Sequence, residues 1–282
     1  MNFKTFYKIY YHHRFLKASF FLKIYLCLTF FVKYLINYFY LPKKKNLDKL
    51  SVNNQNLFEK DFNYLCEYFN SDKGEKFTNQ YAQPSKKNNK IINAHGYANI
   101  YESYFKDIKQ KKLNIIELGA FYGNATAALY FYFKNSFLFS ADINPDMFLY
   151  KSKRVRNFFA NTASRNSIQK NLLDKNIKFD IIIEDASHML KDQIISLFML
   201  FKTLQTGGLF IIEEIDFPEK REDMRINQNK PDLKTILQKA CNKENFSTEY
   251  ITDEEKKYFL KNYDTINFFQ GKTNEFVIIK KK

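Results

Sequence analysis

The chain has 282 residues, of which 45% are hydrophobic, enough for one large domain with a substantial core. This composition excludes intrinsic disorder, collagen and a small disulfide scaffold. The net charge of +15 favours an anionic partner, either nucleic acid or a membrane surface. Ten basic residues and one acidic residue fall within residues 1–50, so nine of the fifteen net charges lie there. Three widely spaced cysteines without a CxxC pair favour a reducing compartment.

An apolar, aromatic segment occupies residues 15–41 and is interrupted by Lys17, Lys23 and Lys33. No charge-free run in it reaches the roughly 18 residues of a spanning helix. Because lysines can extend to the headgroups while aromatic rings sit at the interface, the pattern predicts a helix lying in a membrane surface. The lysines at 43–45 suit an anionic leaflet, so we expect a cytoplasmic protein bound peripherally to the inner face of the membrane. A single span and packing against protein are the alternatives.

The region after this segment is polar and aperiodic over residues 43–60, which predicts a boundary. A helix is expected over residues 62–69, and a second apolar periodic run follows near residues 100–108. The loops between them carry Ser71-Asp72-Lys73-Gly74 and His95-Gly96-Tyr97. We therefore divide the chain into a membrane-surface helix (1–45), a linker and helical lead-in (46–110) and a main domain (111–282).

Alternating strands and helices characterise the main domain. Residues 113–118 form a continuous apolar run, followed by a glycine turn and a helical pattern over residues 125–133. Further strands are expected at 136–141, 179–183, 209–212, 265–269 and 275–279. The pattern predicts an α/β fold with a doubly wound, mostly parallel Rossmann-like sheet and an antiparallel closing strand, plus the N-terminal apolar helical extension.

Acidic residues stand at the carboxyl ends of the predicted strands, where such sheets bind ligands. They are Glu117, Asp142, Asp185, Glu213 and Glu214. A single acid at such a place can simply cap the next helix. Five acids around one edge of a sheet indicate a cationic or hydroxyl-rich ligand.

The first glycine turn, from Gly119 to Gly123, has the spacing GxxxG and follows Glu117. It differs from the GxGxxG of dinucleotide folds, whose pyrophosphate needs a helix N-terminus free of nearby negative charge. An acid there suits a cation, such as the ammonium or sulfonium of S-adenosylmethionine. Asp142, at the end of the second strand, is placed to accept hydrogen bonds from a ribose diol.

These motifs together resemble the class I S-adenosylmethionine-dependent methyltransferases, most closely the metal-dependent sugar O-methyltransferases of macrolide and polysaccharide biosynthesis. The resemblance runs from about residue 69 to the C-terminus and leaves residues 1–60 outside it. It rests on the loop motifs at 71–74 and 95–97, the turn at 117–123, Glu184-Asp185-Ala186-Ser187-His188, and the segment 207–214 ending in Glu213-Glu214.

The resemblance implies specific roles for residues. Asp185, Glu213 and Glu214 would hold a divalent cation, Mg²⁺, and His188 would be the general base. The cofactor S-adenosylmethionine would contact Glu117, Gly119, Ala120, Gly123, Asp142, Thr162 and Asp185. Substrate or lid contacts would come from Asp72, Lys73, His95 and Tyr97. The chain departs from the family pattern at Glu184 and Ala186, at Glu214 and in the adenine-binding segment 161–164.

We therefore expect an O-methyltransferase that acts on a hydroxyl of a saccharide or a lipid-linked glycan. The alternative is a non-catalytic scaffold protein that keeps the fold, since fold alone does not give function. Nucleic acid is not expected as a partner, because the charge excess outside residues 1–50 is only six and an acidic rim repels phosphate. The sequence leaves open whether subunits form a homo-oligomer.

Overall fold

The computed structural model of the chain describes residues 3, 7, 15, 18–40, 44–78 and 91–282. Its centre is a seven-stranded sheet in the order β10-β11-β9-β8-β4-β5-β7. The strands are β4 (Asn114–Leu118), β5 (Phe137–Asp142), β7 (Val155–Phe159), β8 (Phe179–Glu184), β9 (Leu204–Ile212), β10 (Tyr263–Gln270) and β11 (Glu275–Lys281). The predicted doubly wound architecture is confirmed.

The sheet is parallel except for β11, which runs antiparallel to both of its neighbours, β9 and β10. The chain builds outward from β4 through β5 to β7, then returns to the other side of β4 and continues through β8 and β9. The direction of winding thus reverses beside β4. Ligands of doubly wound sheets bind at this reversal, beyond the carboxyl ends of the strands.

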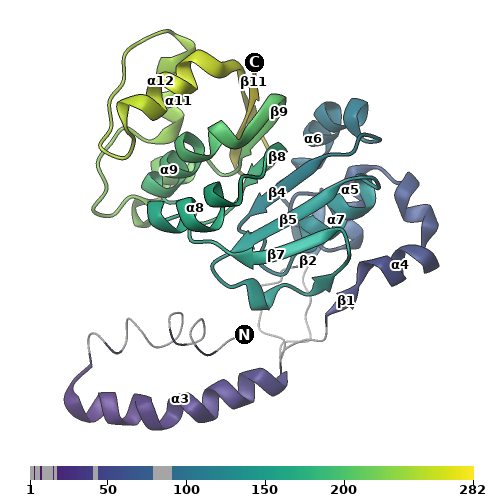
Figure 1. The fold of residues 1–282 in the computed structure, drawn as a ribbon, viewed down its shortest axis with the longest axis vertical. Helices are drawn as coiled ribbons and strands as arrows, with labels where there is room; N and C mark the ends of the chain where they lie inside the picture. The colour runs from purple at the N-terminus through teal and green to yellow at the C-terminus, as the bar shows by residue number, and fades with distance from the viewer. Residues whose placement is uncertain (1–2, 4–6, 8–14, 16–17, 41–43, 79–90) are drawn as a thin grey trace.

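Helices cover both faces of the sheet, as Figure 1 shows. One face carries α5 (Phe62–Tyr68), α6 (Ala98–Phe105) and α7 (Asn124–Tyr132), and the other carries α8 (Arg165–Asn171), α9 (Leu190–Leu200), α11 (Leu233–Cys241) and α12 (Asp253–Asn262). Successive strand residues point to opposite faces, so Ile115 packs in the core with α7 while Ile116 packs in the core with α9. Coverage of both faces explains why the central strands are apolar without alternation.

The sequence analysis missed β7, because this strand is half polar and includes Arg156 and Asn157. It lies at the edge of the sheet and pairs only with β5. An edge strand buries fewer side chains than a central one, so its hydrophobic signal is weak.

The polar stretch before α5 packs on the domain. A short strand, β1 (Lys45–Asn46), pairs with β6 (Tyr150–Lys151), and α4 (Leu47–Asn53) begins at a cap in which Asn46 Oδ1 accepts hydrogen bonds from two backbone amides. Leu47 and Leu57 are buried in the core. Partly buried Leu50 and Phe58 and hydrogen bonds to Asp48 also hold the stretch, and these contacts are too scattered to give a regular period. The limits of the three predicted regions stay a prediction.

The N-terminal helix α3 (Phe20–Tyr40) lies apart from the layered domain in Figure 1. Among the side chains of α3 that the structure describes, which end at residue 36, Leu26 and Phe30 are buried and pack with Tyr7, Phe15 and Tyr34 of the same segment. Ten apolar or aromatic side chains in this part of α3 are exposed: Phe20, Phe21, Leu22, Ile24, Tyr25, Leu28, Phe31, Val32, Leu35 and Ile36. No helix among the described residues has the combined length and hydropathy that a membrane crossing requires.

Candidate active site

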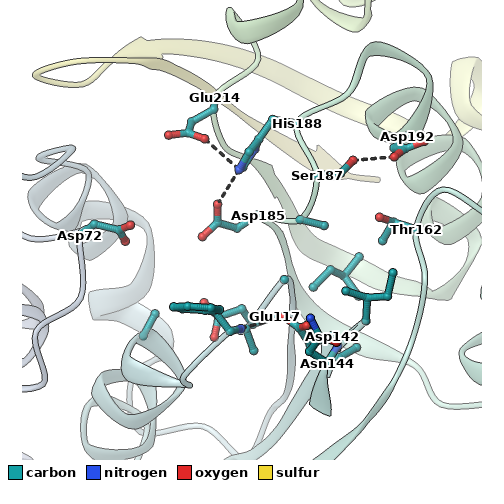
Figure 2. Close-up of a pocket in the computed structure, with 18 of the residues that line it drawn as sticks. Asp72, Glu117, Asp142, Asn144, Thr162, Asp185, Ser187, His188, Asp192 and Glu214 are labelled. Carbon is teal, nitrogen blue, oxygen red and sulfur yellow. Dashed lines mark hydrogen bonds and ion pairs between the residues drawn. The ribbon is translucent and has the colours of Figure 1, made fainter. Parts of the chain in front are cut away.

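A cavity of about 650 Å³ opens at the carboxyl ends of β4, β5 and β8. This volume lies within the usual range for small-molecule sites, roughly 300–1,000 Å³. Residues from distant parts of the chain line it, among them Asp72, Glu117, Asp142, Asp185 and Glu214. Figure 2 shows these side chains around one space. The edge of the sheet to which the sequence analysis assigned the acids is therefore the edge at which the structure has its cavity.

The turn after β4 requires glycine at two positions. Gly119 has φ +86°, and a Cβ there would lie 2.0 Å from the carbonyl oxygen of Asp185. Gly123 has φ +80°, and a Cβ there would lie 2.2 Å from the ring of Phe148. The two glycines let the chain pass close to β8 and then enter α7, while Ala120 lines the cavity between them.

Asp142 holds the opposite wall of this part of the cavity. Its Oδ2 accepts a hydrogen bond of 2.8 Å from the amide of Phe121, and its Oδ1 accepts one of 2.6 Å from the amide of Asn144. Thr162, from the loop after β7, is nearly buried and also lines the cavity. Each carboxylate oxygen of Asp142 can accept a further bond, as a ribose diol would require.

Glu117 is buried at the end of β4. Its Oε2 accepts a hydrogen bond of 2.5 Å from Thr126, whose hydroxyl lies 2.8 Å from that of Ser140. Burial raises the pKa of Glu117 to about 7, although Lys73 and Thr126 act to lower it. No sequence pattern indicates a role for Thr126, which lies within the apolar pattern of α7.

A group of three side chains can offer ligands to a metal ion. One atom each from Asp185, His188 and Glu214 lies within 4.8 Å of the others. His188 Nε2 is 2.9 Å from Glu214 Oε2 and 3.7 Å from Asp185 Oδ1, as the dashed lines in Figure 2 show. Two carboxylates beside a cavity supply the hard oxygen ligands that Mg²⁺ prefers and leave positions for water and substrate oxygens. The donor set therefore fits Mg²⁺.

Two members of this group have an unusual backbone. His188 has φ +55° and Glu214 has φ +54°, both in the left-handed region that residues other than glycine seldom adopt. Such a conformation costs of the order of 1–3 kcal/mol per residue and persists where surrounding structure enforces it. Here it turns both side chains toward the same space.

Glu214 is also held by residues that the sequence analysis did not assign to it. Asn274, in the turn between β10 and β11, donates a hydrogen bond of 2.8 Å to Glu214 Oε1. His95 Nδ1 lies 3.4 Å from the same oxygen. No local pattern indicates Asn274, because its contact depends on how the closing hairpin packs against the sheet.

Glu213 is oriented differently from its neighbour. It is buried, its Oε1 accepts a hydrogen bond of 2.6 Å from the hydroxyl of Tyr101, and its Oε2 accepts one of 2.9 Å from the ammonium of Lys73. The same ammonium lies 2.6 Å from Asp185 Oδ2. The expected role of Glu213 as a metal ligand stays a prediction, since its two oxygens are already paired within the protein.

The fold and part of the sequence are similar to those of known methyltransferases. No protein-family model matches the sequence. Over 128 residues the chain is 26% identical to the 8-demethyl-8-alpha-L-rhamnosyl tetracenomycin-C 2'-O-methyltransferase of Streptomyces olivaceus, a match that covers 43% of this chain and 33% of that protein. The fold is similar to that of MycE methyltransferase from the mycinamycin biosynthetic pathway in complex with Mg, SAH and mycinamycin VI, with a TM-score of 0.59 and 15% identity over 79% of this chain and 54% of MycE. A second MycE structure, with Mg and SAH, gives a TM-score of 0.57 and 15% identity over 79% of this chain and 55% of MycE.

This chain is related to the S-adenosylmethionine-dependent methyltransferases. The resemblance inferred from the sequence motifs is confirmed by the tetracenomycin relative and by the fold of MycE. The chain spans about half the length of MycE, and the match takes in 33% of the tetracenomycin enzyme. The activity of this chain and its substrate are therefore proposals.

The two loop motifs of this chain, at residues 71–74 and 95–97, lie side by side. Backbone hydrogen bonds run from His95 to Asp72 and from Gly96 to Gly74, and the amides of Tyr97 and Ala98 both donate to the carbonyl of Lys73. Asp72 and His95 line the cavity. The ring of Tyr97 is buried and packs 4.5 Å from that of Phe276, which places this side chain in the core. Contacts of all four predicted residues with a substrate stay a prediction.

The charges of the site shift its protonation equilibria. Burial lowers the pKa of His188, but the hydrogen bond and charge of Glu214, together with Asp185, raise it to about 9. A divalent cation at the same carboxylates adds positive charge and favours the neutral imidazole, the form that can accept a proton. For Lys73, burial also lowers the pKa, but Asp185, Glu213 and Glu117 raise it well above its usual range.

Proposed function

We propose that this chain is a Mg²⁺-dependent O-methyltransferase that uses S-adenosylmethionine and acts on a hydroxyl of a saccharide or lipid-linked glycan. The observation that carries the proposal is that Asp185, His188 and Glu214 face the same cavity as the glycine turn at Gly119. A cofactor-binding turn and a metal-type donor set thus share one space. The 2'-O-methyltransferase of a rhamnosyl compound among the relatives supports a sugar acceptor.

Asp185 and Glu214 would hold the metal ion, with water and substrate oxygens as its other ligands. A bound Mg²⁺ supplies Lewis acidity, which makes a neighbouring sugar hydroxyl a stronger acid. The buried position of Glu214 and its hydrogen bond from Asn274 fix one carboxylate in advance. A fixed ligand loses little freedom when a cation binds.

His188 is the proposed general base. Its Nε2 accepts the hydroxyl proton while the hydroxyl oxygen forms a bond to the methyl carbon. Bound S-adenosylmethionine would supply the methyl group, with its sulfur as the leaving group that keeps the bonding electron pair. Asp185 and Glu214 flank Nε2 and stabilise the imidazolium that results. The cavity aligns donor and acceptor for the in-line displacement.

We further propose that α3 brings the protein to the cytoplasmic surface of an anionic membrane. Lys23, Leu26, Phe30 and Lys33 recur at spacings of three and four residues and so form one stripe of the helix. The exposed apolar side chains occupy the rest of its circumference. A protein groove would cover one side of such a helix, whereas lipid can cover a broad face while the lysines on the opposite stripe reach the headgroups. The lysines at 43–45 add charge complementary to anionic lipid.

Calorimetric titration of S-adenosylmethionine into the full chain, with and without Mg²⁺, tests the enzymatic proposal. We expect micromolar cofactor binding by the wild type, His188→Ala and Asp185→Ala, with the response to Mg²⁺ lost only in Asp185→Ala. Asp264→Ala is the matched control, because Asp264 is exposed and does not line the cavity. No cofactor binding by the folded wild type would favour a scaffold that keeps only the fold.

A further inference from the structure

Lys73 is a lysine buried at the centre of the acidic site. Its side chain is 1% exposed, and its ammonium lies 2.6 Å from Asp185 Oδ2, 2.8 Å from Glu213 Oε1 and 3.9 Å from Glu117 Oε1. Lysine is almost never fully buried unless its charge is paired. Three carboxylates from the ends of three neighbouring strands supply that pairing here.

The loop that carries Lys73 is fixed independently of any ligand. The carbonyl of Lys73 accepts two hydrogen bonds of 2.9 Å, from the amides of Tyr97 and Ala98. The adjoining Ser71 accepts a bond at its carbonyl from Gly74, and its own amide donates to Cys66 in α5. The ammonium thus reaches the acids from a backbone tied to two helices, so its position belongs to the fold.

Lys73 divides the acids into two sets. Glu213 lies on the lysine side, with both oxygens engaged by Lys73 and Tyr101. Asp185 is shared, since Oδ2 faces Lys73 while Oδ1 faces His188. Glu214 lies wholly on the other side, with His188 and Asn274 as its partners.

We propose that Lys73 is a permanent internal cation that occupies the Glu213 side of the site, so that a divalent cation binds on the side of Asp185, His188 and Glu214 and with restrained affinity. This inference rests on the proposed metal-dependent function. Glu213 then serves as the counter-ion of Lys73. A fixed positive charge a few ångströms from the metal position weakens metal binding, because the two cations repel in a site of low dielectric. Weaker binding of the ion leaves it able to exchange with the cellular pool.

Metal binding by the full chain tests the role of Lys73 directly. Mn²⁺ is the probe, with free Mn²⁺ measured by electron paramagnetic resonance and Mg²⁺ affinity measured by calorimetry. For Lys73→Met we expect affinity to rise by about tenfold or more, because one repelling charge is gone and Glu213 is released as a further ligand. Lys220→Met is the matched control, since Lys220 is an exposed lysine paired with Asp216, and it should leave the affinity unchanged.

A double variant keeps the test valid if Lys73→Met fails to fold. Lys73→Met with Glu213→Gln removes one cation and one acid, so the net charge of the site is kept, while Glu117 retains its bond from Thr126 and Asp185 its contact with His188. We expect this variant to bind Mn²⁺ as the wild type does, because Glu213 is not a ligand while Lys73 is present. Loss of Mn²⁺ binding in the double variant would overturn the proposal, as would unchanged or weaker affinity in folded Lys73→Met.

The wild type separates this inference from the proposed function. Mn²⁺ binding gained in Lys73→Met but absent from the wild type would overturn Mg²⁺ dependence while supporting Lys73 as the internal cation of the site. Absence of binding in all variants would overturn both. Cofactor titration of the same samples reports whether the methyltransferase site is intact in each case.

Discussion

The acidic site and helix α3 differ in how their side chains are paired: those of the site find partners within the protein, whereas many of those on α3 are exposed. Around Lys73, oppositely charged groups come from distant strands and loops and pair within the protein, with little exposure to water. On α3, ten apolar or aromatic side chains are exposed, and the side chains that pack with its buried pair belong to the N-terminal segment itself. The site is therefore largely prepared by the fold alone, whereas α3 presents exposed apolar side chains, which we propose are covered by lipid. This contrast can be tested from either side.

The largest effect is expected from breaking the prepared site at its turn. In Gly119→Ala, the new Cβ would meet the backbone of Asp185 at 2.0 Å, and neither backbone can move without separating β4 from β8. We expect cofactor binding to be lost and the melting temperature to fall, as measured by calorimetry and thermal unfolding. Gly207→Ala is the matched control, because Gly207 has φ +74° but nothing within 4 Å of its Cβ position, so only the backbone strain of about 1–2 kcal/mol applies. Equal effects of the two substitutions would contradict the close approach.

The next largest effect is expected from substitutions on helix α3. Phe21 and Leu28 are 82% and 71% exposed, and replacing both by glutamate removes apolar area that lipid would bury. Because fully burying such a side chain contributes about 1.5–3 kcal/mol, we expect the partitioning of the full chain into phosphatidylglycerol vesicles to fall by more than about tenfold. Flotation on a density gradient measures it.

Val52→Glu serves as the control for the α3 variant, since Val52 is 70% exposed on α4 and lies outside the proposed lipid face. Vesicles of phosphatidylcholine alone show how much of the binding depends on lipid charge. Undiminished flotation of the double variant would refute the lipid contact of α3.

A smaller effect sharpens the description of the metal group. Asn274→Ala removes the hydrogen bond to Glu214 Oε1 and leaves that carboxylate less firmly oriented, with His188 and His95 as its neighbours. Partners that orient metal ligands typically contribute about 10–100-fold to metal affinity, so we expect about tenfold weaker Mn²⁺ binding, measured by electron paramagnetic resonance. Asn267→Ala, on the same hairpin but bonded to Tyr104, should leave the affinity unchanged. If Asn274→Ala binds Mn²⁺ like the wild type, Asn274 does not position Glu214 for the metal.

The smallest effect concerns the junction between the N-terminal part and the domain. Asp48 accepts hydrogen bonds from Tyr130, Ser152 and the amide of Lys153. Burial raises the pKa of Asp48, but the bond from Ser152 and the other two lower it overall. An acid with a lowered pKa in the folded state stabilises the fold above its unfolded pKa, and this stabilisation is lost as the pH falls through the folded pKa.

We therefore expect Asp48→Asn to lower the free energy of unfolding by about 1 kcal/mol at pH 7 and by less at pH 3. Urea unfolding at the two values measures the difference. Asp264→Asn is the control, because Asp264 is exposed and its contact with Lys280 is 3.9 Å long. A loss of stability that is the same at both pH values would mean that the charge of Asp48 contributes nothing.

The strand and helix pattern, the glycine turn and the edge of the sheet that carries the acids could all be predicted from the sequence. Buried parallel strands need continuous apolar runs, and the turn after β4 needs glycine where the chain meets Asp185, so both features are written in short segments. Strand β7 was not predicted, because an edge strand buries too little side-chain surface to require apolar residues.

The partner of each acid can be seen only in the tertiary structure. Lys73 meets Asp185 across 112 positions and Glu213 across 140, and Asn274 meets Glu214 across 60. Neither propensity nor periodicity carries information over such separations, because each is a property of neighbouring residues on one helix or strand. Glu213 and Glu214 are adjacent acids with the same side chain, and the left-handed backbone at Glu214 sends them to different partners. That difference arises from packing around the sheet edge, which the local sequence does not encode.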